Sequence, residues 1–157
     1  MEIILAENHG FCYGVKRAVE MANEAADSDG KSYTLGPIIH NPQVVGRLES
    51  KGVSPIQEVS DIDEGTMIIR SHGVGPAIYE EAEEKGLNIL DATCPHVKKA
   101  QQDAKSVIED GMTLVILGEK NHPEVKSINL WANNKGIIIE DFYSTELCKT
   151  LNKIKGH

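Results

Sequence analysis

The chain has 157 residues, of which 40% are hydrophobic and 25% charged, a composition that excludes a disordered or fibrous protein. Sixteen basic and twenty-four acidic residues give a net charge of −8, and no basic run marks a face for binding nucleic acid. Aromatic residues make up only 4% of the sequence, which also disfavours base stacking. We therefore expect no nucleic-acid partner.

The N-terminus lacks the features of a secretion signal. Residues 1–6 have neither a basic region nor a long apolar core, and no apolar run approaches the ~18 residues of a membrane span. The three cysteines, Cys12, Cys94 and Cys148, are odd in number and widely spaced, unlike a secreted disulfide framework. These features predict a cytoplasmic protein with no membrane partner.

Short apolar segments alternate with helical patterns in the first half of the chain. Residues 2–6 predict a short buried strand, and the apolar spacing over 14–26 predicts a helix. A second strand is expected at 32–35. A short helix at 44–48 should stop at Gly52, because glycine favours a helix C-terminus.

The same alternation continues in the second half. The expected elements are, in order, a strand at 66–69, a helix at 76–85, a strand at 87–92, a helix at 95–110, a strand at 112–117, a helix at 125–132, a strand at 136–139 and a helix at about 144–153. This alternation indicates parallel βαβ units, so the predicted fold class is α/β with about six strands. The helix after Cys94 could bridge two such units, and we expect one domain over 1–94 and a second over 95–157.

Cysteines and histidines follow five of the predicted strands. They are Cys12, His40, His72, Cys94 and His122. The carboxyl ends of parallel strands meet at one edge of a sheet, where ligands bind in open α/β folds, so we expect these side chains to lie together. A histidine considered alone is more often structural than functional, and it is the shared position that favours a function.

Two of the cysteines are candidate metal ligands or nucleophiles. Cys12 lies in a glycine-flanked loop and Cys94 precedes a proline, so both begin helices, where the helix dipole favours a thiolate. Their wide separation excludes a local zinc knuckle or CxxC motif. Cys148 lies on a predicted helix and has no candidate partner nearby in the sequence. We therefore interpret it as a small buried hydrophobic residue.

The histidines favour an anionic ligand. Imidazoles and helix N-termini can hold a diphosphate while still donating protons, which suits His40, His72 and His122. Glu124 could act as a general acid or a proton relay, although a first-turn glutamate favoured by the helix dipole is an equally good account.

Two other classes of protein remain open at this point. One is a phosphate-binding or metal-dependent hydrolase module in which the three histidines surround a divalent ion. The other is a non-catalytic domain whose cysteines are simply buried.

Five motifs, taken together, resemble the LytB/IspH family. They are Gly10–Ala18 (GFCYGVKRA), Ile39–Pro42 (IHNP), Ser71–Val74 (SHGV), Asp91–Pro95 (DATCP) and His122–Val125 (HPEV), in the order that the family has them. The resemblance covers nearly the whole chain. It implies reductive dehydroxylation of 4-hydroxy-3-methylbut-2-enyl diphosphate to isopentenyl and dimethylallyl diphosphate in the non-mevalonate pathway of isoprenoid biosynthesis.

The resemblance also implies a cofactor and roles for individual residues. Cys12 and Cys94 match two of the three cysteines that hold a [4Fe-4S] cluster, which an external donor of the ferredoxin or flavodoxin type reduces. The substrate-binding and catalytic residues that it implies are His40, His72 and His122 for the diphosphate, and Glu124 with His122 for delivery of a proton to the allylic hydroxyl.

The family has three similar α/β domains in a cloverleaf arrangement around the cluster. By this resemblance the chain corresponds to the first domain and most of the second, and the third cluster cysteine lies beyond residue 157. Cys148 does not stand in the motif of that ligand. We therefore expect residues 1–12 to pack with the third domain, and the chain to be a fragment that is inactive alone, with its cluster absent or labile.

Overall fold

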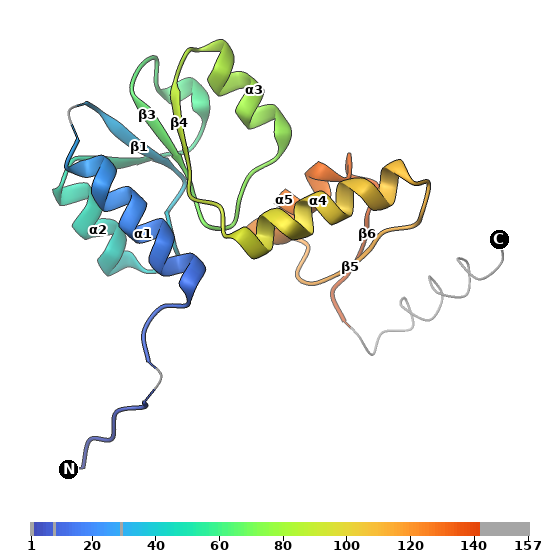
Figure 1. Cartoon of the computed structure of the whole chain (residues 1–157), viewed down its shortest axis with the longest axis horizontal. Coiled ribbons are helices and arrows are strands. Elements are labelled where there is room, and N and C mark those ends of the chain that lie inside the picture. The colour runs from blue at the N-terminus through green and yellow to red at the C-terminus, as the bar shows by residue number, and fades with distance from the viewer. Residues whose placement is uncertain (1, 8, 29, 142–157) are drawn as a thin grey trace.

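The computed structural model describes residues 2–7, 9–28 and 30–141 of the chain. Within these residues, a four-stranded sheet and its helices form a first unit, and a two-stranded sheet with two helices forms a second (Figure 1). None of the described helices is long and apolar enough to cross a membrane.

The first sheet is entirely parallel and has the order β2-β1-β3-β4. Its strands are β1 (Ser32–Leu35), β2 (Val53–Ile56), β3 (Thr66–Ile69) and β4 (Asn88–Asp91). Ser32 is in register with both Val53 and Thr66, and Thr66 with Asn88, so the four strands end level with one another. The loops that follow them therefore start at one edge.

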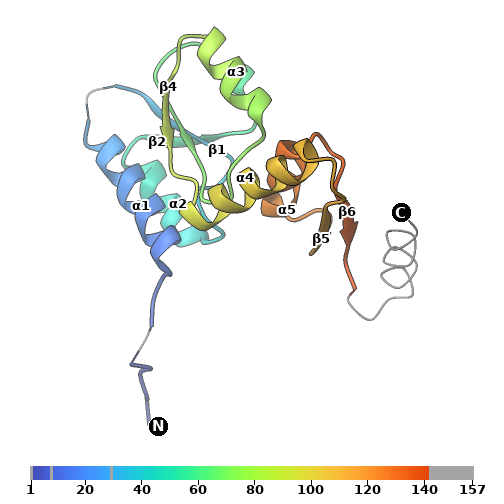
Figure 2. The ribbon, with the colours of Figure 1, turned by 45° about the vertical axis from the view of Figure 1, so that its right-hand side comes forward.

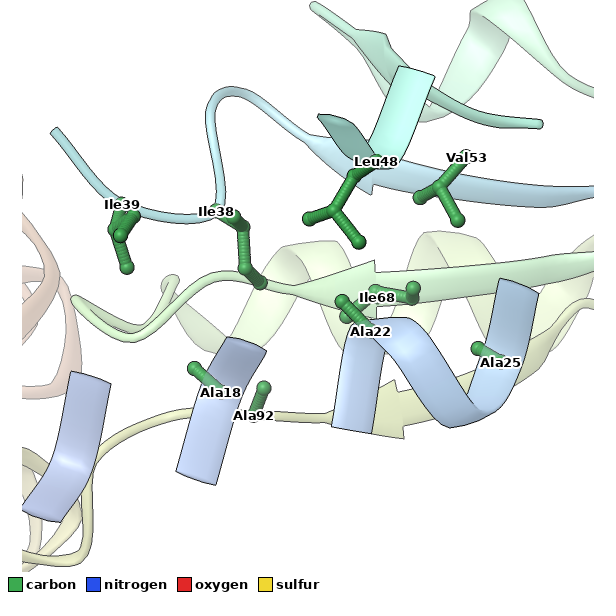
Figure 3. Packing of buried hydrophobic residues seen from close by; sticks show 9 residues of the cluster. All are labelled: Ala18, Ala22, Ala25, Ile38, Ile39, Leu48, Val53, Ile68 and Ala92. Atoms are coloured by element: carbon green, nitrogen blue, oxygen red, sulfur yellow. The ribbon is translucent and has the colours of Figure 1, made fainter. Parts of the chain in front are cut away.

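Both faces of this sheet are covered by apolar side chains. On one face, Ile68 of β3 packs with α1 (Tyr13–Ala26) and α2 (Pro42–Ser50). Figure 3 shows Ala22 of α1 beside Ile68 and Ala18 near Ala92. The small alanine side chains let the helix lie close to the sheet.

The other face of the sheet has a core of its own. Met67 and Ile69, the neighbours of Ile68, pack there with α3 (Pro76–Glu84) and the 3₁₀ turn η1 (Val59–Asp61). Successive side chains of a strand point to opposite faces, so β3 contributes to both cores.

The second unit consists of α4 (Pro95–Glu109), β5 (Val115–Leu117), α5 (Pro123–Trp131) and β6 (Ile137–Ile139). β5 and β6 are parallel neighbours, with Val115 in register with Ile137. α4 and α5 lie side by side (Figure 2). Across their contact, the side-chain amide of Gln101 donates a hydrogen bond to the hydroxyl of Ser127 at 3.1 Å.

Proline begins most of these helices. α2, α3, α4 and α5 each have a proline in the first turn, where its missing N–H costs nothing. The residues just before three helices are candidate site residues: Cys12 precedes α1, Cys94 precedes α4 and His122 precedes α5. Helix starts therefore set the directions of these side chains.

The α/β class and the parallel pairing predicted from the sequence are confirmed. The buried strand expected at 2–6 is wrong, since these residues form no strand and Ile3, Ile4 and Leu5 are 74%, 83% and 76% exposed. The apolar residues could form a strand, but none of the described strands lies beside them to supply the hydrogen-bond partners that a strand needs. The helix expected at 144–153 lies outside the described residues, and the division into domains after residue 94 stays a prediction.

β2 (Val53–Ile56) and η1 were not predicted from the sequence. β2 contains Ser54 and Pro55, which weaken an apolar strand pattern, and an edge strand tolerates proline because its outer N–H groups need no partner. The strand expected at 112–117 is shorter than predicted and begins at Val115.

Candidate functional site

The loops that follow β1, β3 and β4 are hydrogen-bonded to one another at the carboxyl edge of the first sheet. The amide N–H of Cys94 donates to the carbonyl of Ser71 at 2.9 Å, and the N–H of Ser71 donates to the carbonyl of Ile38 at 3.4 Å. The His40 loop, the His72 loop and the Cys94 turn therefore form one connected backbone layer.

Three histidines converge beside this layer. The ring centroids of His40 and His72 are 4.6 Å apart, those of His72 and His122 are 5.5 Å apart, and those of His40 and His122 are 6.2 Å apart. A ring nitrogen of each lies within 4.8 Å of those of the other two. The structure thus brings together all three histidines that the sequence singles out.

His122 belongs to the second unit, and contacts of α5 bring it to the others. The hydroxyl of Ser127 lies 2.8 Å from the carbonyl oxygen of His72, to which it donates. The indole N–H of Trp131 donates to the carbonyl of Val74 at 2.9 Å. These bonds attach α5 to the loop between β3 and α3, at positions five and nine residues beyond His122.

The environment of His72 keeps its ring uncharged at neutral pH. Burial lowers the pKa of His72 to about 4, and positive charge on His40, Arg70 and His122 acts in the same direction. Its Nδ1 atom is buried and has no hydrogen-bond partner among the described residues. A negatively charged ligand at this cluster would supply the missing interaction.

The sequence candidate Glu124 lies in the first turn of α5, directly beside His122. Its backbone N–H donates to Nδ1 of His122 at 3.3 Å, so the neutral ring of His122 carries its proton on Nε2. The carboxylate of Glu124 is half-buried and makes no hydrogen bond or ion pair to another described residue. Both groups are therefore available for proton transfer.

The two candidate cysteines start α1 and α4, and both are free thiols. Cys12 is exposed and Cys94 is half-buried, which argues against the interpretation that they are simply buried core residues. A Cβ atom placed on Gly14 would lie only 2.5 Å from the sulfur of Cys94, so the first turn of α1 directly abuts this thiol. Cys148 lies outside the described residues.

A network of charged side chains that the sequence analysis missed supports the Cys94 turn. The carboxylate of Asp91 accepts hydrogen bonds from the N–H of Thr93 at 2.9 Å and the hydroxyl of Tyr79 at 3.0 Å, and it pairs with Lys98 at 2.6 Å. Burial alone would raise the pKa of Asp91, but the hydrogen bonds from Lys98 and Thr93 lower it below its ordinary value.

Arg17 of α1 also supports this turn. Its guanidinium donates to the carbonyls of Thr93 at 3.2 Å and Asp91 at 3.4 Å. The helix that begins at Cys12 is therefore tied to the segment that ends at Cys94. Arg17 lies in the motif Gly10–Ala18 and Asp91 in the motif Asp91–Pro95, so membership of these motifs was the sequence signal that could have pointed to both residues.

A cavity of about 240 Å³ opens between the start of α1 and the histidines. Its lining residues are Phe11, Val15, Ile39, His40, Asn41, Ser71 and His72. It lies between Phe11 and Val15, on either side of Cys12 in the sequence, and two of the three histidines, so a ligand there would contact His40 and His72.

The family model for LytB protein matches residues 3–155. The chain belongs to the LytB family. It is 53% identical over 139 residues to a 4-hydroxy-3-methylbut-2-enyl diphosphate reductase of Geotalea uraniireducens, a match that covers 88% of this chain and 49% of that protein. The corresponding reductase of Pelobacter propionicus is 49% identical over 154 residues, covering 98% of this chain and 55% of that protein.

Solved structures agree with this membership. A structure described as (E)-4-hydroxy-3-methyl-but-2-enyl diphosphate reductase, the terminal enzyme of the non-mevalonate pathway, is 45% identical, with a TM-score of 0.80 over 99% of this chain and 54% of that one. The Plasmodium falciparum reductase is 33% identical, with a TM-score of 0.82 over 86% of this chain and 43% of that one.

The chain spans about half the length of the curated relatives that it matches. The resemblance that the motifs indicated is thus confirmed at the level of the family. The comparisons do not favour the alternative of a metal-dependent hydrolase module, although the spacing of the three histidines would suit an ion.

Proposed function

We propose that this chain supplies part of the active site of a reductase that removes the hydroxyl group of 4-hydroxy-3-methylbut-2-enyl diphosphate. The observation that carries the proposal is the convergence of three imidazoles, from loops of both units, within 4.8 Å of one another at the sheet edge where the Cys94 turn also lies. Relatives with this name that match 88% and 98% of the chain support the choice of substrate.

The donor set fits an iron–sulfur cluster. Cys12 is an exposed and Cys94 a half-buried sulfur ligand, both at helix N-termini, and neither side chain caps its helix. These two residues would hold a [4Fe-4S] cluster together with a cysteine outside this chain. When bound, the cluster would supply the two electrons of the reduction.

The histidines would hold the diphosphate. The uncharged ring of His72 can donate one N–H to an oxyanion, and the Nε2 proton of His122 is free to do the same. His40 is exposed and closes the third side of the group. Negative charge on the ligand would in turn favour protonation of the His72 ring, so binding and proton uptake would be coupled.

Glu124 would deliver the proton that makes the hydroxyl a leaving group. The reaction breaks the allylic C–O bond, consumes two electrons and two protons, and releases the oxygen as water. Protonation of the hydroxyl accounts for one proton, and the allylic carbon takes up the other.

We propose a ferredoxin- or flavodoxin-type electron donor and a cytoplasmic location. We also propose that residues 1–12 pack with a third domain outside this chain.

Anaerobic reconstitution tests this proposal. Iron, sulfide and substrate turnover would be measured for the 157-residue chain and for the same chain continued to the length of its relatives. We expect turnover only in the longer protein, and loss of both cluster and turnover in its Cys12→Ser and Cys94→Ser variants but not in Cys148→Ser. Full cluster content in either of the first two variants would contradict the assignment of that cysteine.

A further inference from the structure

Arg70 is a half-buried cation without a partner. It follows β3, its Nε atom is buried without a hydrogen bond, and its guanidinium makes no hydrogen bond or ion pair to any described residue. Burial lowers the pKa of Arg70, which reflects the cost of removing this charge from water. A guanidinium has five N–H donors, and buried donors in proteins normally have acceptors.

The position of this guanidinium is built into the fold. Gly36, at the end of β1, has a φ of +69°, and a Cβ atom there would lie 2.7 Å from Nη1 of Arg70. The guanidinium therefore lies against a residue whose left-handed backbone conformation favours glycine. Its place beside the sheet edge is thus fixed by the neighbouring backbone.

Arg70 lines a cavity of about 320 Å³ on the α3 side of the sheet edge. The lining residues are Leu35, Gly36, Gln57, Arg70, Gly73, Val74, Gly75, Ile78, Pro123, Lys126, Ser127 and Leu130. Two of them are cations and none is a carboxylate, in a chain with twenty-four acidic residues. Lys126 is exposed and has no ion pair among the described residues.

The backbone adds to the positive character of this cavity. Gly75 lines the cavity and is the N-cap of α3, which no side chain caps, so the positive end of that helix dipole lies at the cavity wall. Helix N-termini of this kind bind anions.

We propose that this cavity is a second anion site, which binds a small molecule carrying a phosphate dianion. A planar guanidinium and a lysine ammonium together match the two charges of a phosphate, whereas a carboxylate would need only one cation. The cavity shares no lining residue with the one beside His40 and His72, so the site is separate from that of the proposed function and does not depend on it.

Occupancy of this site would act on the histidine cluster through α5. Ser127 lines the cavity, and its hydroxyl donates to the carbonyl of His72. A phosphate held between Arg70 and Lys126 would bridge the first unit to α5. The same α5 carries His122 at its start.

A titration followed by ¹H–¹⁵N NMR tests the proposal on the 157-residue chain. Inorganic phosphate, glycerol 3-phosphate and acetate would be added in turn to the unaltered chain and to Arg70→Gln, Lys126→Gln, Lys135→Gln and His40→Ala. We expect phosphate to shift the amide signals of Gly73, Gly75 and Ser127. We expect Lys126→Gln and Arg70→Gln each to weaken binding at least about tenfold.

The control variants decide between the two anion sites. Lys135 is exposed and outside the cavity, so Lys135→Gln removes the same charge and should leave phosphate affinity within about twofold. Lys126→Gln alters an exposed side chain and keeps the test valid if Arg70→Gln does not fold. Tighter binding of glycerol 3-phosphate than of phosphate would identify a phosphorylated metabolite as the ligand, and equal binding would identify phosphate itself.

Three outcomes would overturn the proposal. The first is no binding of either phosphate at millimolar concentration, and the second is binding of acetate as tight as that of phosphate. The third is binding that His40→Ala abolishes while Lys126→Gln does not, because the anion would then occupy the histidine cluster.

Discussion

The two parallel sheets differ in how completely they are covered, and this difference divides their roles at the candidate site. In the first sheet Met67, Ile68 and Ile69 are fully buried between two apolar cores. In the second, Leu117 and Ile137 are 54% and 37% exposed. The first unit can therefore hold its loops in place with its own core, whereas the second depends on α5 being attached to the first.

The largest expected effect is on the core of the first sheet. Ile68→Ala should lower the free energy of unfolding by about 2–5 kcal/mol, because it leaves a cavity between β3 and α1. The matched Ile137→Ala, at a partly exposed position of β6, should cost less than about 1.5 kcal/mol. Urea denaturation followed by far-UV circular dichroism gives both values. Equal losses would remove the distinction between the two sheets.

Ser127→Ala tests the attachment of α5. It removes the hydrogen bond to the carbonyl of His72 and leaves the buried amide of Gln101 without its acceptor, so we expect a loss of about 1–3 kcal/mol. Substrate-diphosphate affinity should fall with it, because His122 lies at the start of the same helix. Ser106→Ala, on the exposed face of α4, should change neither quantity. Unaltered diphosphate affinity in Ser127→Ala would contradict the account of how α5 is held.

Gly14→Ala tests the contact between the two cysteine-bearing helix starts. The new methyl group would meet the sulfur of Cys94, so we expect a loss of about 1–3 kcal/mol and a changed rate of alkylation of that thiol. Gly46, in α2, has open space around its Cα atom, and Gly46→Ala should be neutral or stabilise by up to about 1 kcal/mol. If both variants behaved alike, α1 would not abut Cys94 as described.

The smallest effect concerns pH. In the protein without a ligand, burial lowers the pKa of His72 to about 4. A bound diphosphate should raise this pKa, so binding should be accompanied by proton uptake at pH values between the pKa of His72 in the ligand-free protein and its pKa in the complex. Diphosphate affinity should therefore rise as the pH falls toward about 6, with proton uptake measurable by calorimetry in buffers of different ionisation enthalpy. His72→Asn should flatten this dependence, whereas His96→Asn, at an exposed position of α4, should not. A pH dependence equally steep in His72→Asn would assign it to other groups.

Much of the fold follows from local sequence signals. Apolar spacing with proline and glycine at the ends predicts the helices, and most of the strands of the first sheet are apolar runs. β2 was missed because Pro55 interrupts its pattern, and residues 2–6 were predicted wrongly because an apolar run does not reveal whether a neighbouring strand exists.

The site was predictable only where topology alone decides it. Parallel strands end at one edge, and this places His40, His72 and Cys94 near one another. The hydrogen bond from Arg17 to the Thr93 carbonyl, and the lack of a partner for Arg70 among the described residues, depend on which residues come into contact in the folded chain. No pattern in the linear sequence encodes those contacts.

The most direct test of the central claim is calorimetric titration of 4-hydroxy-3-methylbut-2-enyl diphosphate into this chain. Matched alanine variants of His40, His72, His122 and the exposed His96 complete the experiment. The account predicts that binding of the diphosphate is weakened at least about tenfold by each of the first three substitutions and is unchanged by His96→Ala. Binding to His122→Ala as tight as to the unaltered chain would contradict it, because the second unit would then contribute nothing to the site.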